Sequence, residues 1–176
     1  MNDLPFTDAF KGGKDGGRNV FGTAAGVFAE KGYHKTTVDE IARAIGVAKG
    51  TVYYHFKNKE ELYLAVIQEG VNLFQHRLRQ AADSAGTPGE KIKNLVQCQL
   101  RFHEEEKDLV FLFLKELCGT NLRRDVLAQM LSGCLQIIRG VIEEGIKDGV
   151  FRDVDPEIAT SSLFGMVTIS SFHYIS

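Results

Sequence analysis

The stretch from Thr36 to Leu62, TTVDEIARAIGVAKGTVYYHFKNKEEL, contains two short helical patterns separated by a glycine. Thr37 and Glu40 have the spacing of a capping box, in which the hydroxyl and the carboxylate each accept a backbone N–H. Gly46 predicts the end of the first helix, because glycine adopts the left-handed conformation at little cost. The apolar positions of this helix recur with helical spacing: Val38, Ile41, Ala42 and Ile45.

The second helical pattern starts at about Ala48 and places Val52 and Phe56 four residues apart on one face. At about 100° per residue, four positions point away from that face: Gly50, Tyr53, Tyr54 and Lys57. Two short helices with apolar inner faces, and an outer face free to enter a major groove, are what a helix-turn-helix requires.

The segment GVAKGTVYYHFKNKEELY resembles the recognition-helix region of the tetracycline-repressor (TetR) family. The preceding TAAGVFAEKGYHKTTVDEIA (23–42) resembles the first helix and the scaffold helix of that family, so the resemblance covers about Arg18 to Tyr63. One departure is Ala48, where the family often has a capping serine; its absence removes a cap worth about 0.5–2 kcal/mol. The resemblance implies DNA contacts at Thr37, Lys49, Thr51, Tyr53, Tyr54, His55 and Lys59.

The chemistry of these side chains suits DNA. The ammonium groups of Lys49, Lys57 and Lys59 would meet backbone phosphates, which supply most of the affinity. The hydroxyls of Thr37 and Thr51 would donate to phosphate, and the tyrosine rings would lie against thymine methyl groups. Alternatively, either tyrosine packs against the long helix that follows. No arginine lies on this face, so base recognition would rest on few contacts together with DNA shape.

The charge distribution agrees with a DNA-binding amino-terminal part. Residues 1–59 carry 9 Lys/Arg and 6 Asp/Glu, whereas residues 60–176 carry 12 and 17. A basic unit on an acidic remainder suits a protein that presents one end to phosphate. No apolar run of about 18 residues and no secretory signal pattern is visible, which predicts a cytoplasmic protein with no membrane segment. The three cysteines, Cys98, Cys118 and Cys134, are widely spaced and form no metal or redox motif. We expect them to be small hydrophobic core residues.

All remaining patterns are helical, so the sequence predicts an all-α fold. The expected helices run from Lys59 to about residue 85, from Pro88, over 109–117, over 122–147 and from Pro156. The run LVFLFLKEL at 109–117 is also compatible with a buried strand, and the family layout favours a helix. The predicted organisation is a flexible arm (1–17), a helix-turn-helix domain (18–58), and a ligand-binding and dimerisation domain (59–176).

The family resemblance implies a small-molecule cavity within the carboxy-terminal helices. Phenylalanines with few polar residues between them favour a hydrophobic or amphipathic effector, although each phenylalanine also suits a plain core. The candidate ligand-binding residues are Gln99, Phe102, His103, Phe113 and Arg123.

Signals for catalysis are weak. His103-Glu104-Glu105-Glu106 starts like a zinc-protease motif, but no second histidine follows at the required spacing. The five histidines have no metal-ligand spacing and no phosphate-binding glycine loop is present, so no catalytic residue, metal or cofactor is predicted. The alternative to a DNA-binding regulator is a helical small-molecule-binding protein or enzyme whose helix-turn-helix is incidental.

The sequence analysis therefore predicts a ligand-responsive regulator, most simply a repressor, that binds a palindromic operator as a homodimer. Operator palindromy would mirror the twofold axis of the protein. The apolar pattern after Ile158 predicts a dimer helix, and the resemblance implies one further helix beyond it. The large apolar residues of this pattern are Leu163, Phe164, Val167, Phe172 and Ile175.

Overall fold

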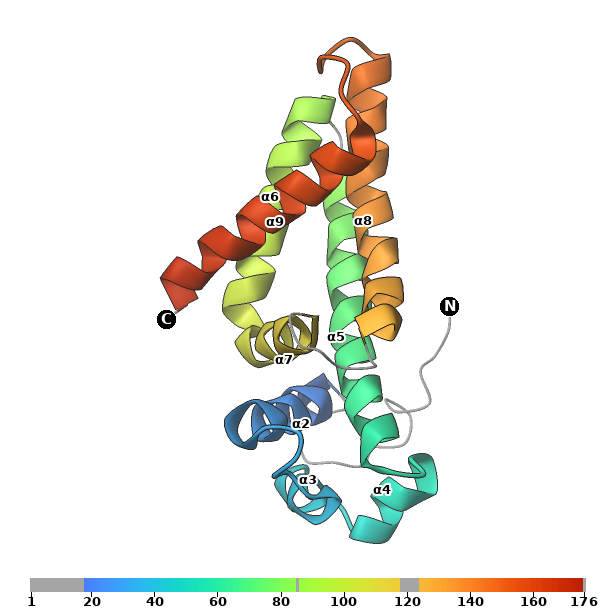
Figure 1. Cartoon of the computed structure of the whole chain (residues 1–176), viewed down its shortest axis with the longest axis vertical. Coiled ribbons are helices and arrows are strands. Elements are labelled where there is room, and N and C mark those ends of the chain that lie inside the picture. Colours follow the sequence, from blue (N-terminus) through green and yellow to red (C-terminus); the bar gives the residue numbers. More distant parts are fainter. Residues whose placement is uncertain (1–17, 85, 118–123, 176) are drawn as a thin grey trace. The chain divides into compact units, whose positions relative to one another are not determined.

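The computed structural model describes residues 18–84, 86–117 and 124–175, and all regular elements among them are α-helices (Figure 1). The predicted arm (1–17), Cys118 and Arg123 lie outside the described residues. The predicted all-α fold is confirmed, and 109–117 forms a helix. The helices are α2 (Arg18–Lys31), α3 (Val38–Ala44), α4 (Lys49–His55), α5 (Lys59–Ala82), α6 (Pro88–Glu105), α7 (Lys107–Leu117), α8 (Arg124–Lys147) and α9 (Pro156–Ile175).

The chain divides into two compact units. The first unit comprises the chain up to Gly70 together with Asp108–Cys118, and the second comprises Val71–Lys107 and Gly119–Ser176. Helix α5 starts in the first unit and ends in the second. The first unit thus holds more than the helix-turn-helix, because it includes the first half of α5 and all of α7 except its first residue, Lys107.

The core of the first unit forms because α2, α3 and α4 each contribute one apolar face to it. Phe28 of α2 is fully buried and meets the ring of Tyr63 edge-on, with ring centroids 4.8 Å apart. The Tyr63 hydroxyl donates a 2.9 Å hydrogen bond to Glu116 of α7. Gly70 lets α7 approach closely, because a Cβ atom there would lie 3.1 Å from Leu109.

The second unit is built from α6, α8 and α9, which contact one another, together with the second half of α5. Helix α6 starts with the predicted Thr87 capping box and Pro88, and the Asp155 carboxylate accepts backbone N–H bonds at the start of α9. Residues 125–147 of α8 are long and apolar enough to cross a membrane by length and composition. Here α8 supplies core residues instead: Leu127, Leu131, Cys134, Ile138, Val141 and Ile142.

Candidate nucleic-acid interface

Local hydrogen bonds fix the first helix of the helix-turn-helix. The backbone N–H and the hydroxyl of Thr37 donate to Glu40 Oε2 at 2.9 and 3.0 Å, and the Glu40 N–H donates to the Thr37 hydroxyl at 3.3 Å. Lys31 of α2 adds an ion pair with Glu40 at 2.7 Å. The hydrogen bond from Lys31 and those from Thr37 lower the pKa of Glu40 to about 2. The predicted capping box of α3 is confirmed.

The turn between α3 and α4 follows the sequence pattern. Gly46 has φ +76°, as expected for the residue that ends α3, and the Val47 N–H donates to the Ala42 carbonyl at 2.9 Å. Ala48 provides no side-chain cap for α4, as its chemistry predicts. On the inner face of α4, Val52 is buried. Helix α4 therefore depends on this packing and on the turn for its orientation.

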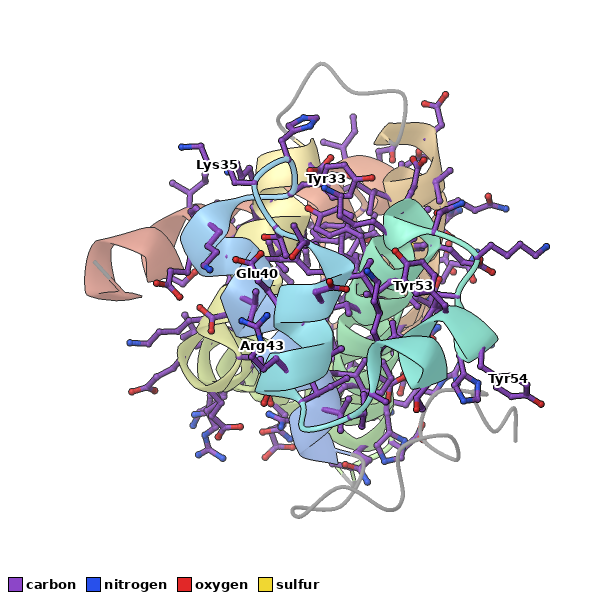
Figure 2. All side chains as sticks on the ribbon, turned by 90° about the horizontal axis from the view of Figure 1, so that it is seen from below. Tyr33, Lys35, Glu40, Arg43, Tyr53 and Tyr54 are labelled. Atoms are coloured by element: carbon purple, nitrogen blue, oxygen red, sulfur yellow. The ribbon has the colours of Figure 1, made fainter. Side chains whose placement is uncertain are left out.

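The outward face of α4 (Lys49, Gly50, Tyr53, Tyr54 and Lys57) carries two exposed aromatic rings. The Tyr54 side chain is 85% exposed and that of Tyr53 is 47% exposed. Figure 2, which views the molecule from the α3–α4 side, shows Tyr54 extending outward from α4. Tyr54 is therefore not a core residue, whereas Tyr53 is exposed over only part of its surface.

The Lys49 ammonium has two partners on this surface. It lies 2.7 Å from Asp39 Oδ1 on α3 and 5.8 Å from the centre of the Tyr53 ring. The hydrogen bond with Asp39 raises the pKa of Lys49. Because both members of the ion pair are about half exposed, solvent screens their attraction. Lys49 therefore keeps its charge and can exchange Asp39 for another anion.

The remaining predicted DNA-contact residues differ in exposure. Gly50 and Lys57 are exposed, whereas Thr51 and His55 are half-buried. The exposed Thr37 has its hydroxyl committed to Glu40. Lys59 is half-buried and its ammonium donates to backbone carbonyls, so the geometry gives no support to the predicted phosphate contact.

Two basic side chains in the same unit were missed in the sequence reasoning. Lys35 lies in the turn between α2 and α3, and Arg43 lies on α3; both are exposed and are labelled in Figure 2. The signal for Arg43 was present in the sequence. It lies at none of the inward positions of α3, and a charged residue there must face solvent.

The predicted ligand-binding residues are only partly brought together. Gln99, Phe102 and His103 lie on one face of α6 and are all buried. Phe113 belongs to α7 in the first unit, and Arg123 lies outside the described residues. Phe102 packs against Phe74 with ring centroids 4.7 Å apart, which is a core contact.

Gln99 and His103 form a polar ladder with α9, defined here as Gln99, His103, Thr168 and Ser171. Gln99 Nε2 donates to the Thr168 hydroxyl at 2.9 Å and to a carbonyl of α9 at 3.1 Å. His103 Nδ1 lies 2.7 Å from the Ser171 hydroxyl oxygen. Burial lowers the pKa of His103 to about 4. The ladder joins α6 to α9 through neutral groups.

The second unit also contains an apolar groove of about 750 Å³. None of the predicted ligand-binding residues lines it. Its charged lining residues are Arg152 and Asp155, and the Asp155 carboxylate caps α9. Within the described residues, no group of three or more His, Cys, Asp or Glu could hold a metal ion. The apolar lining comes from Ile92, Ile142, Val150, Phe151, Val154, Ile158, Ala159 and Leu163.

Two family models match this chain over its two halves. Residues 21–66 match the model described as bacterial regulatory proteins, tetR family, and residues 85–172 match a tetracyclin repressor-like C-terminal domain. The chain is 31% identical to the fatty acid metabolism regulator protein of Bacillus subtilis over 150 residues, which are 84% of this chain and 77% of the relative.

This chain belongs to the tetR family. Solved structures agree: the transcriptional regulator FadR from Bacillus subtilis, in complex with stearoyl-CoA, is 29% identical with a TM-score of 0.81, covering 90% of this chain and 86% of that one. A putative fatty acid metabolism regulator from Clostridium perfringens is 33% identical with a TM-score of 0.80, covering 88% and 84%. The tetR-family chain is a ligand-responsive, DNA-binding transcriptional regulator and not an enzyme. The alternative of a small-molecule-binding protein or enzyme with an incidental helix-turn-helix is therefore rejected.

Proposed function

We propose that this tetR-family regulator is a cytoplasmic, homodimeric repressor that binds a palindromic operator and is released by a long-chain acyl-CoA. The observation that carries the operator-binding part is the outward face of α4. Tyr54 is 85% exposed on α4, a short helix without a side-chain cap, and has no role in the core. Such a side chain is available to the edges of bases.

The proposed DNA contacts divide by chemistry. Tyr53 and Tyr54 read base edges and thymine methyl groups, and Gly50 lets the backbone of α4 approach the DNA. Lys49 exchanges Asp39 for a phosphate, and Lys57 meets a phosphate directly. Further contacts to the sugar–phosphate backbone come from Thr51 and His55, and from the two basic residues Lys35 and Arg43, whereas both donors of Thr37 are taken by Glu40.

The effector proposal rests on the relatives and on the few buried polar groups among the apolar residues of the second unit. The Bacillus subtilis relative is named a fatty acid metabolism regulator, and the FadR structure contains stearoyl-CoA. An acyl thioester needs an apolar channel with a few polar groups. Gln99 and His103 remain the proposed orienting groups, with Phe102 beside them. An effector that took their hydrogen bonds would compete with α9, which supports a coupling between ligand binding and helix packing.

The homodimer proposal rests on α9, although on a different face from the one predicted. Val167 is buried, and Leu163 and Phe164 are half-buried, so these residues serve their own unit. The side chains of Phe172 and Ile175 are outside the description. The exposed stripe instead contains Ile158, Met166 and Ile169, at 67%, 61% and 63% exposure. An apolar helix exposed along one side is typical of an interface.

The test starts from DNA selected by the purified regulator from a random duplex library. The selected sequence should be a palindrome, bound with a stoichiometry of two chains per duplex. Stearoyl-CoA should release this DNA, whereas free coenzyme A and acetyl-CoA should not, because they lack the apolar chain. Recovery of no preferred sequence would disprove the operator-binding role. Equal release of the DNA by stearoyl-CoA, acetyl-CoA and free coenzyme A would disprove a preference for long acyl chains.

A further inference from the structure

The Lys59 side chain, at the start of α5, is surrounded by backbone oxygens of the first unit. Its ammonium donates to the carbonyls of Tyr33 at 2.8 Å, Thr36 at 2.9 Å and His34 at 3.3 Å. It also lies 4.5 Å from the centre of the Tyr33 ring. An ammonium has three N–H donors. All three therefore have carbonyl partners, and the ring lies beside the charge.

These carbonyls belong to the turn between α2 and α3, where the helical hydrogen-bond ladder is interrupted. Helix α2 ends at Lys31, and Gly32 has φ +79°. Carbonyls just beyond a helix end need partners from elsewhere. Thr36 directly precedes Thr37, the residue that caps α3. By binding this turn, Lys59 fixes the backbone from which α3 starts.

We propose that Lys59 is a positioning residue for DNA recognition: it sets the start of α3 relative to the first turn of α5 and does not contact phosphate. This inference rests on the operator binding proposed above. To reach a phosphate, the ammonium would have to leave three charge-assisted hydrogen bonds and an aromatic ring. Lys57, two residues earlier, has an exposed side chain and loses no such contacts.

The geometry distinguishes lysine from arginine at this position. A compact ammonium directs three donors toward three carbonyls on one side of it. A guanidinium is planar, is longer, and presents its donors as a fork that suits carboxylate and phosphate. Arginine would therefore restore a phosphate contact but would not restore the carbonyl contacts of Lys59. Rescue of operator binding by arginine would therefore indicate a phosphate contact, and failure of rescue would indicate the carbonyl contacts.

The experiment compares Lys59→Met, Lys59→Arg and the matched control Lys57→Met. Dissociation constants are measured for the selected operator and for an unrelated duplex across a salt series. Lys57→Met should lower the salt slope by about one unit on both duplexes, as the loss of a phosphate contact requires. Lys59→Met should keep the wild-type slope and weaken operator binding by about tenfold or more, since charge-assisted bonds are lost. Lys59→Arg should not rescue it.

The opposite pattern would overturn the proposal: a slope lowered by one unit in Lys59→Met, with both slope and affinity restored in Lys59→Arg. Failure to select any operator is a different result, since it removes the proposed function before Lys59 is tested.

A measurement on the wild-type chain covers the case in which Lys59→Met does not fold. The ¹H–¹⁵N signals of the lysine ammonium groups are recorded with and without operator. The Lys59 signal should be protected from exchange and keep its position when operator is added, while the Lys57 signal shifts. A Lys59 signal that shifts on operator binding as far as that of Lys57 would show a phosphate contact and disprove the positioning role.

Discussion

Two capping boxes of the same sequence type open helices in the two units. In the first unit, Thr37 and Glu40 start the 7-residue α3; in the second, Thr87 and Glu90 start the 18-residue α6. Their backbone-to-carboxylate bonds are 2.9 and 2.7 Å, and the return bonds are both 3.3 Å. Identical local chemistry therefore supports helices of very different length.

Helices α3 and α6 differ in the contacts that support them in addition to their capping boxes. Helix α3 has Lys31 on its capping carboxylate and Lys59 on the turn that precedes it, both polar contacts near the surface. Helix α6 has a buried ladder to α9, in which Gln99 and His103 bond partners more than 60 residues away in sequence. Short helices are marginal alone. Helix α3 is therefore supported by polar contacts near the surface, whereas helix α6 is supported by buried ones.

The strongest challenge to this contrast is the apolar core of the first unit. Phe28→Ala removes a ring that is fully buried against Tyr63. The variant should lose about 3–5 kcal/mol of unfolding free energy, as expected for truncating a buried phenylalanine. Urea unfolding followed by circular dichroism measures it. A loss below 1 kcal/mol would mean that surface contacts, and not the core, hold the first unit together.

The next prediction separates DNA recognition from folding. Tyr54→Ala should weaken operator binding by about 1–3 kcal/mol, because it removes a contact to bases. The unfolding free energy should stay within about 0.5 kcal/mol of wild type, since the side chain is exposed. Fluorescence anisotropy and urea unfolding measure the two quantities. Unchanged operator affinity would remove Tyr54 from the DNA contacts.

The buried ladder of the second unit should be sensitive to acid. The folded-state pKa of His103 is about 4, below the model-peptide value of 6.5. As pH falls below 6.5, the unfolded chain takes up a proton that the folded chain does not, so stability falls until pH reaches about 4. At pH 5 this difference amounts to about 2 kcal/mol.

The variant His103→Gln should lose this part of the acid sensitivity. Urea unfolding at pH 7 and pH 5 compares it with the wild type. The difference in unfolding free energy between the two pH values should be smaller in the variant. Equal differences in both proteins would show that His103 titrates normally and that the ladder admits its charge.

The smallest expected effects compare the two capping boxes directly. Thr37→Ala and Thr87→Ala should each lower the unfolding free energy by about 0.5–2 kcal/mol, the usual value of a cap. Only Thr37→Ala should also weaken operator binding, because α3 supports α4. Parallel urea and anisotropy titrations test this. Equal effects of the two variants on operator affinity would contradict a division of roles between the units.

The sequence predicted the features that depend on neighbouring residues. Both capping boxes, Gly46 and the uncapped Ala48 follow from residues a few positions apart. The features that the sequence did not predict depend on residues far apart in the chain. The carbonyl partners of Lys59 lie 23 to 26 residues earlier, and the outward face of α9 depends on how that helix packs against α6 and α8. The DNA contacts themselves remain predictions, since side-chain chemistry alone cannot distinguish an exposed lysine from a turn-binding one.

The exposure of Tyr53 and Tyr54 has a consequence for how such a regulator changes over generations. Because neither side chain is buried, substitutions at these positions leave the stability of the chain nearly unchanged. New operator preferences are then reachable by single steps, each of which yields a folded protein. Substitutions of Lys59 would instead disturb the fold, because its ammonium binds carbonyls of the turn between α2 and α3. Duplicated copies of the gene would therefore be expected to diverge first at positions 53 and 54 and to retain position 59.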